Sequence, residues 1–168
     1  MPNSAAIASP HREASIAARD MLQDGGNAFD AAVAAVLTLC VVQPHQIGLG
    51  GFGGTLVGYR RDQNRAFAID FDSRAPLAYT PEAFVDARDR TTGYRSISVP
   101  AILAGLEMVL NTHGRIGWKA AMAAAIRCAE QGFVVDRILG DCLQKWSAET
   151  DAESRAALFP DGNIPRAG

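Results

Sequence analysis

The longest apolar stretch of the chain covers residues 28–42, in which only Asp30 and Thr38 are polar. A helix that is apolar on every side is buried rather than amphipathic. The stretch is too short to cross a bilayer, which takes about 20 apolar residues. Asn27 fits the N-cap, Asp30 places a carboxylate in the first turn, and Pro44 ends the segment. The pattern therefore predicts a buried helix around which the fold is organised.

Further stretches carry apolar residues at helical spacing. The first follows Ser9-Pro10, which fits the N-cap and the first helical position, and it ends at Gly25-Gly26. The others are predicted over residues 100–113, 118–131 and about 136–149.

Two apolar-rich runs, Thr55–Arg60 and Ala66–Phe71, flank a polar turn and predict a β-hairpin. Ser96–Val99 is predicted to form another strand, and Ile7-Ala8 a short one. The charged segment 86–94 is expected to be a solvated loop. Helices before and after a hairpin, with few strands, indicate the α+β class.

Composition narrows the class of protein. A net charge of −2 argues against a nucleic-acid or anionic-membrane surface, and 168 residues suffice for one core-bearing domain. Residues 1–10 show no positive region followed by an apolar run. We therefore expect a cytoplasmic protein, or a periplasmic or secreted one whose signal was removed. Cys40, Cys128 and Cys142 lack close spacing and are expected to be buried free thiols, with no metal site and no cofactor.

A glycine-dense segment follows the buried helix, at positions 48, 50, 51, 53 and 54. It lacks the strand-before, helix-after order of a dinucleotide fingerprint and has no Lys-Ser/Thr ending. Close backbone packing, at positions where side chains would not fit, is therefore favoured over phosphate binding.

Several motifs carry a family resemblance. The segments GGNAFDAAVA and VVQPHQIGLGG resemble the N-terminal part of the large subunit of γ-glutamyltransferases. The resemblance continues through SVPAILAGLE, THGRIGWKAAMAAAIRCAEQGFVV and FPDG, and so covers the chain from Ile7 to Pro165. Several motifs in the family's order and spacing make it specific.

The resemblance implies a fold and a chemistry. The fold would be the four-layer αββα sandwich of N-terminal-nucleophile hydrolases, of which residues 1–168 would form a single partial domain. The family's precursor cuts itself, and the threonine freed at the start of the small subunit attacks an amide with its own α-amine as base. Met1 is followed by Pro2, and no threonine of the chain matches the cleavage motif. We therefore assign no catalytic residue to this chain, and we expect a small subunit as its partner.

Arg74 is the candidate substrate-binding residue. The family clamps a substrate carboxylate with the arginine of an Arg-Glu-x-Ala-Pro segment, and a planar guanidinium offers a carboxylate two parallel donors. Here the segment reads Asp72-Ser73-Arg74-Ala75-Pro76, so that an aspartate holds the clamp position and Arg74 lies two residues later. The alternative is an exposed arginine paired with Asp70 or Asp72. Arg95 is a second candidate cation, with loop surface as its simpler interpretation.

Other polar residues have simpler interpretations. His45 is expected to be a hydrogen-bonded structural histidine, and the pair Asp70 and Asp72 a solvated strand end.

Three functions follow from the resemblance. The first is a γ-glutamyl amide hydrolase or acyl transferase acting on a small amide with a carboxylate. The alternatives are an acylase for non-glutamyl carboxylic amides and a non-catalytic scaffold that kept part of the fold.

Overall fold

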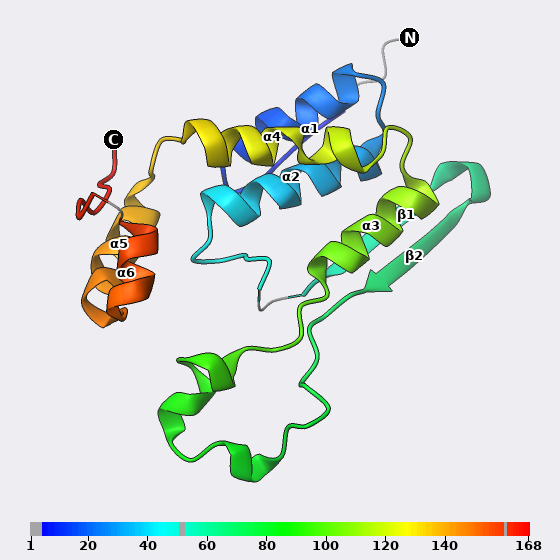
Figure 1. Ribbon diagram of the computed structural model, residues 1–168. Helices are drawn as coiled ribbons and strands as arrows, with labels where there is room; N and C mark the ends of the chain where they lie inside the picture. Colours follow the sequence, from blue (N-terminus) through cyan, green and yellow to red (C-terminus); the bar gives the residue numbers. More distant parts are fainter. Residues whose placement is uncertain (1–4, 51–52, 160) are drawn as a thin grey trace.

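The computed structural model describes residues 5–50, 53–159 and 161–168, and these contain helices and one antiparallel hairpin (Figure 1). The class is therefore α+β, as predicted. The elements, in chain order, are α1 (Arg12–Gln23), α2 (Ala28–Val42), β1 (Thr55–Arg60), β2 (Arg65–Asp70), α3 (Ile102–His113), α4 (Trp118–Gln131), α5 (Arg137–Glu149) and α6 (Ala152–Leu158).

Helix α2 lies at the centre of the core and packs against α1, α3 and α4. Val33 and Val42 have no exposed surface, and Leu37 is 5% exposed. Burying a side chain of this size stabilises the fold by about 1.5–3 kcal/mol. The prediction of a buried helix over residues 28–42 is confirmed, with the same bounds.

The start of α2 is fixed by a capping box between Asn27 and Asp30. The Asn27 side chain accepts hydrogen bonds from the backbone N–H groups of Phe29 and Asp30, while Asp30 Oδ2 accepts one from the Asn27 N–H at 2.8 Å. Asp30 also accepts from the backbone N–H groups of Arg115 and Ile116, in the connection between α3 and α4. One side chain thus ties α2 to a segment 85 residues away.

The hairpin pairs β1 with β2 from Thr55 opposite Asp70 to Arg60 opposite Arg65. Asn64 closes the turn in the left-handed region, at φ 46°, which asparagine tolerates better than most residues. Leu56 and Ile69 pack on the main core. Phe71, just beyond β2, lies against Gly105 of α3, where an added Cβ would come within 2.1 Å of the phenyl Cγ.

Only some glycines of the glycine-dense segment pack closely against other residues. A Cβ on Gly53 would lie 2.2 Å from the Phe71 carbonyl oxygen, and one on Gly54 would lie 3.0 Å from the Phe71 ring. Gly48 and Gly50 face open space, so the prediction of close packing is wrong for them. Gly51 lies outside the described residues.

Two predictions near the N-terminus are wrong. The first helix begins at Arg12, with His11 rather than Ser9 as its N-cap. The His11 imidazole accepts a hydrogen bond from the Glu13 N–H at 3.2 Å, while the Ser9 hydroxyl donates to the His11 carbonyl oxygen. Ile7 and Ala8 form no strand, because no strand of the described chain lies beside them for pairing.

The strand predicted over residues 96–99 is reduced to a single bridge between Arg74 and Val99. The next hydrogen-bonded pair would place Pro76 opposite Ile97, and proline has no N–H to donate. Residues 94–96 turn into a 3₁₀ helix instead. The charged segment 86–94 also contains a 3₁₀ helix, Ala87–Arg90, capped by Asp86.

The C-terminal helices form a separate small core. Leu139, Leu143 and Phe159 are buried together there, and Figure 1 shows α5 and α6 beside the end of α4. Helix α6 was not predicted from the sequence, although Asp151 caps it by accepting a hydrogen bond from the Ser154 N–H at 2.8 Å.

Candidate ligand site around Arg74

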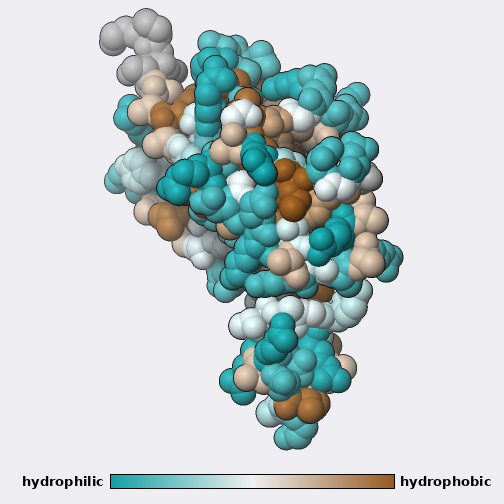
Figure 2. All heavy atoms as spheres, turned by 90° about the vertical axis from the view of Figure 1, so that its left-hand side faces the viewer, coloured by the Kyte–Doolittle hydropathy of each residue, from teal (hydrophilic) through white to brown (hydrophobic). Residues whose placement is uncertain are grey.

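Arg74 lies where the chain leaves the hairpin for a long excursion, residues 75–98, that returns to α3. Its backbone N–H donates to the Val99 carbonyl oxygen at 3.3 Å, and the Val99 N–H donates to the Arg74 carbonyl oxygen at 2.7 Å. These two bonds join the ends of the excursion. Figure 2 shows the excursion as a lobe below the main body, joined to it by a narrow neck. The backbone of Arg74 is therefore held at the base of this lobe.

Two cavities meet at Arg74. One, of about 380 Å³, lies between the end of β2 and helix α3, and Asp70, Asp72 and Met108 help to line it. The other, of about 200 Å³, lies inside the excursion, and Arg90 and Arg95 help to line it. We call this second cavity the arginine pocket; its full lining is Ser73, Arg74, Ala75, Pro76, Tyr79, Phe84, Arg90, Arg95, Ser96, Ile97 and Ser98.

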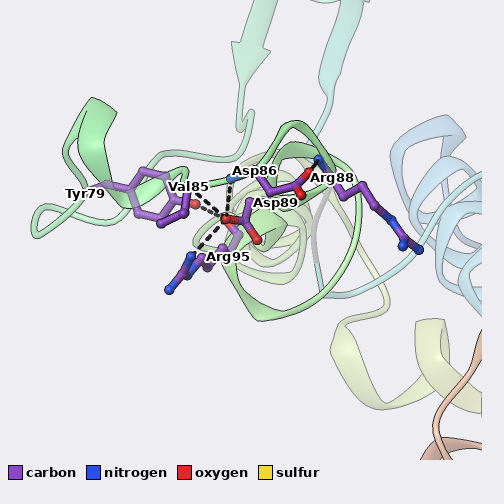
Figure 3. A network of polar contacts seen from close by, with 6 residues as sticks. All are labelled: Tyr79, Val85, Asp86, Arg88, Asp89 and Arg95. Carbon is purple, nitrogen blue, oxygen red and sulfur yellow. Dashed lines mark hydrogen bonds and ion pairs between the residues drawn. The ribbon is translucent and has the colours of Figure 1, made fainter.

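Asp89 braces the excursion from within (Figure 3). Its carboxylate accepts hydrogen bonds from the backbone N–H groups of Val85, at 2.9 Å, and Asp86, at 3.1 Å. The same oxygen forms an ion pair with Arg95 at 2.9 Å. These contacts, the Asp86 backbone bond first, lower the pKa of Asp89. Asp89 is therefore ionised at neutral pH and holds Arg95 at the edge of the arginine pocket.

Two aromatic rings form another wall of the pocket. Tyr79 and Phe84 meet edge to face, with ring centroids 4.9 Å apart. The Arg90 guanidinium lies 5.5 Å from the centroid of the Phe84 ring, in a cation–π contact. The Tyr79 hydroxyl donates to the carbonyl oxygen of Arg95. The rings thus contact Arg90 through its guanidinium and Arg95 through its backbone.

No ion pair joins Arg74 to Asp70 or Asp72 in the described part of the chain. Asp70 Oδ1 instead accepts a hydrogen bond from the Asp72 N–H at 3.1 Å, and Asp72 Oδ1 accepts one from the Ser73 N–H at 2.8 Å. The paired-surface interpretation of Arg74 is therefore wrong for these residues. Its role in binding a ligand stays a prediction.

The structure brings Arg95 to the same cavity as Arg74, whereas the sequence favoured plain loop surface for it. Sequence reasoning missed Arg90 altogether. Its place depends on the 3₁₀ turn at Ala87–Arg90 and on the ring of Phe84, and neither was visible as a pattern. A run of alternating charges gives no signal of which side chains share a cavity.

His45 differs from its prediction. Both ring nitrogens are enclosed and find no hydrogen-bond partner among the described residues, so the expected hydrogen-bonded histidine is not found there.

The cysteines are free thiols, of which Cys128 is buried and Cys40 and Cys142 are half-buried. Burial raises the pKa of Cys40 to about 11, so the thiol is protonated at neutral pH.

Within the ranges that the structure describes, no group of three or more metal-ligating side chains is placed to hold an ion. No helix in these ranges has both the length and the apolar character needed to cross a membrane.

Comparison with known proteins decides the family. A family model described as gamma-glutamyltranspeptidase matches residues 14–168. The chain belongs to the γ-glutamyltranspeptidase family. A glutathione hydrolase proenzyme of Bacillus subtilis subsp. natto is 33% identical over 170 residues, which cover 96% of this chain and 29% of the relative. This γ-glutamyltranspeptidase family chain thus spans less than a third of that relative's length.

Solved structures agree with this family membership. The γ-glutamyltranspeptidase of Helicobacter pylori superposes with a TM-score of 0.87 at 29% identity, over 99% of this chain and 50% of that one. A cephalosporin acylase from Bacillus halodurans superposes with a TM-score of 0.78 at 25% identity, over 100% of this chain and 36% of that one. The fold of this γ-glutamyltranspeptidase family member is therefore similar both to a γ-glutamyltranspeptidase and to a protein named a cephalosporin acylase.

Proposed function

We propose that this chain is the N-terminal portion of the large subunit of an amide-cleaving enzyme, and that residues 1–168 form a single partial domain. The observation that carries the proposal is the family match over residues 14–168, together with the 29% of the Bacillus subtilis relative that the chain spans. That relative is named a proenzyme, which supports self-cleavage. The small subunit would carry the nucleophilic threonine.

The open sheet supports a larger fold. In the described residues β1 and β2 pair only with each other, which leaves each strand one unpaired edge. On β1, Val57 is 78% exposed and Tyr59 58% exposed. Unpaired edges and exposed apolar side chains favour pairing with further strands. A four-layer αββα sandwich, completed by the rest of the protein, would cover both.

The proposed reaction needs no residue of this chain as nucleophile. The threonine hydroxyl oxygen attacks the amide carbonyl carbon, and its proton passes to the α-amine. Backbone donors stabilise the oxyanion, the C–N bond breaks, and the amine leaves with that proton. Water, or a second amine in the transferase case, then attacks the acyl-enzyme ester and releases the threonine. In this scheme the present chain contributes binding, with Arg74 holding an acidic end of the acyl donor.

An acylase for non-glutamyl carboxylic amides is the second candidate. Asp72 occupies the position where the family's clamp arginine is expected, and a carboxylate there repels a substrate carboxylate. The similarity to the cephalosporin acylase supports the same candidate. Both candidates share the amide chemistry and differ in the acyl group.

A substrate panel separates the candidates in the complete protein that carries this chain. γ-Glutamyl p-nitroanilide and glutaryl p-nitroanilide differ only in the α-amino group, and acetyl p-nitroanilide lacks the acidic end. We expect cleavage of at least one acidic anilide and none of the acetyl compound. Preference for the glutaryl compound would favour the acylase. Failure to cleave any of the three would contradict the enzymatic proposal and favour a non-catalytic scaffold.

A further inference from the structure

The charged side chains that line the arginine pocket are all positive. Residues 72–99 contain four acidic side chains and four arginines, namely Asp72, Glu82, Asp86, Asp89, Arg74, Arg88, Arg90 and Arg95. Three of the arginines line the pocket, and none of the acidic residues does. The fold of the excursion therefore gathers positive charge around a small cavity although its overall composition is balanced.

Two of the three arginines that line the pocket have no acidic partner among the described residues. Asp89 neutralises Arg95 through their ion pair at 2.9 Å. No carboxylate of the described chain pairs with Arg74 or Arg90. Arg90 is held through the face of its guanidinium against Phe84, and such a contact leaves the N–H donors at the guanidinium edge available. The pocket thus presents two uncompensated positive charges.

The size of the cavity limits its ligand. Its volume of about 200 Å³ is below the roughly 300–1,000 Å³ of pockets for drug-sized ligands. A small acid fits this space. One carboxylate saturates the paired donors of one guanidinium, so two guanidinium groups match two carboxylates better than one.

We propose that the arginine pocket binds a dicarboxylate, with Arg74 and Arg90 each pairing with one carboxylate and with Asp89 positioning Arg95 at the rim. The acidic end of the acyl donor would then carry two carboxylates, and Arg90 would be the residue that determines this specificity. The assignment to the acyl donor rests on the proposed function. The binding itself is measurable without turnover.

The test compares succinate with butyrate, which have the same number of carbon atoms and differ by one carboxylate. Isothermal titration of the complete protein is expected to give succinate a Kd lower by about tenfold or more, because a charge-assisted hydrogen-bonded pair has about this effect. Equal Kd values for the two acids would overturn the proposal. Inorganic phosphate is the third probe, and binding of phosphate without binding of succinate would also overturn it.

Variants assign the effect to Arg90. We expect Arg90→Gln to raise the Kd of succinate about tenfold and to leave that of butyrate within about twofold. Arg90→Lys keeps the charge without the planar donors and should fall between the two. Arg88→Gln is the matched control, because Arg88 lies on the same 3₁₀ helix, does not line the pocket, and points away from Tyr79 and Arg95 in Figure 3. An equal loss in Arg88→Gln would show a general charge effect and overturn the assignment.

The two proposals fail separately. If the complete protein binds succinate through Arg90 but cleaves none of the three anilides, the proposed function is wrong and the dicarboxylate site stands. If it cleaves acidic anilides but does not prefer succinate to butyrate, the function stands and the dicarboxylate site is wrong. Thermal unfolding of each variant checks that the fold is retained.

Discussion

Asp30 is a carboxylate with no exposed surface whose partners are backbone N–H groups rather than a cation. Oδ1 accepts from Arg115 and Ile116 at 2.9 and 3.1 Å, and Oδ2 accepts from Asn27 and Arg115 at 2.8 and 3.0 Å. Burial alone would raise the pKa of Asp30, but these bonds together lower it. The sequence predicted the carboxylate in the first turn, whereas the partners across the fold could not be predicted.

Asp30→Asn is expected to destabilise the protein by about 2–4 kcal/mol. An asparagine keeps one acceptor oxygen and turns an NH₂ group toward N–H donors, which leaves them unpaired in the interior. Chemical denaturation of the variant measures the change. Asp20→Asn is the control, because the Asp20 side chain is 42% exposed and pairs with the neighbouring Arg19; its change should stay within about 0.5 kcal/mol. Similar losses in both variants would contradict the account.

The effect of Asp30 depends on pH in a defined direction. The pKa of Asp30 in the folded protein lies below its ordinary value, which is about 3.9 in an unfolded chain. Its contribution is therefore fully present above about pH 4 and is lost as the pH falls through the folded pKa. The difference in unfolding free energy between the wild-type protein and Asp30→Asn should shrink below about pH 4. A difference that stays constant down to about pH 2 would contradict this.

Arg74→Ala tests the predicted role of Arg74 in binding. In the complete protein we expect kcat/KM for an acidic anilide to fall about 10- to 100-fold, because a charge-assisted contact to the substrate is lost. Arg88→Ala, in the same excursion, should change it less than about twofold. An unchanged kcat/KM in Arg74→Ala would remove Arg74 from the site.

At the scale of elements, the sequence predicted the helices better than the strands. The bounds of α2 and α4 match their predictions because each has a clear pattern and a clear stop: α2 is a continuous apolar run that Pro44 ends, and α4 has apolar residues at helical spacing up to Gly132. The segment 96–99 has strand composition, but its pairing stops after the bridge between Arg74 and Val99, because Pro76 would face Ile97 and has no N–H to donate. The arginine pocket could not be predicted, because it is formed by contacts among 3₁₀ turns and aromatic rings that leave no pattern in the sequence.

The contact between the hairpin and α3 depends on Gly105. Any Cβ there would overlap the Phe71 ring, so Gly105→Ala should push Phe71 off the helix and destabilise the protein by about 1–3 kcal/mol. Gly48→Ala is the control, because a Cβ there meets nothing within 4 Å. Thermal unfolding measures both variants. A Gly105→Ala protein as stable as Gly48→Ala would contradict the packing described for this contact.

At the scale of the whole molecule, the hairpin edges and the exposed face of β1 support the proposal that further structure completes this fold. The chain spans 29% of the Bacillus subtilis relative and 50% of the solved Helicobacter pylori chain. Its core around α2 is well packed, while the hairpin and the Arg74 excursion lie at its periphery (Figure 1). These peripheral elements are the ones expected to meet the small subunit and its substrate.

Denaturing intact-mass analysis of the complete protein, with N-terminal sequencing of each species, tests the central proposal most directly. We expect two chains, the smaller of which begins with threonine. Replacement of that threonine by alanine should leave a single uncut chain and abolish amide cleavage. A wild-type protein that stays a single uncut chain and still cleaves acidic anilides would contradict the proposed mechanism.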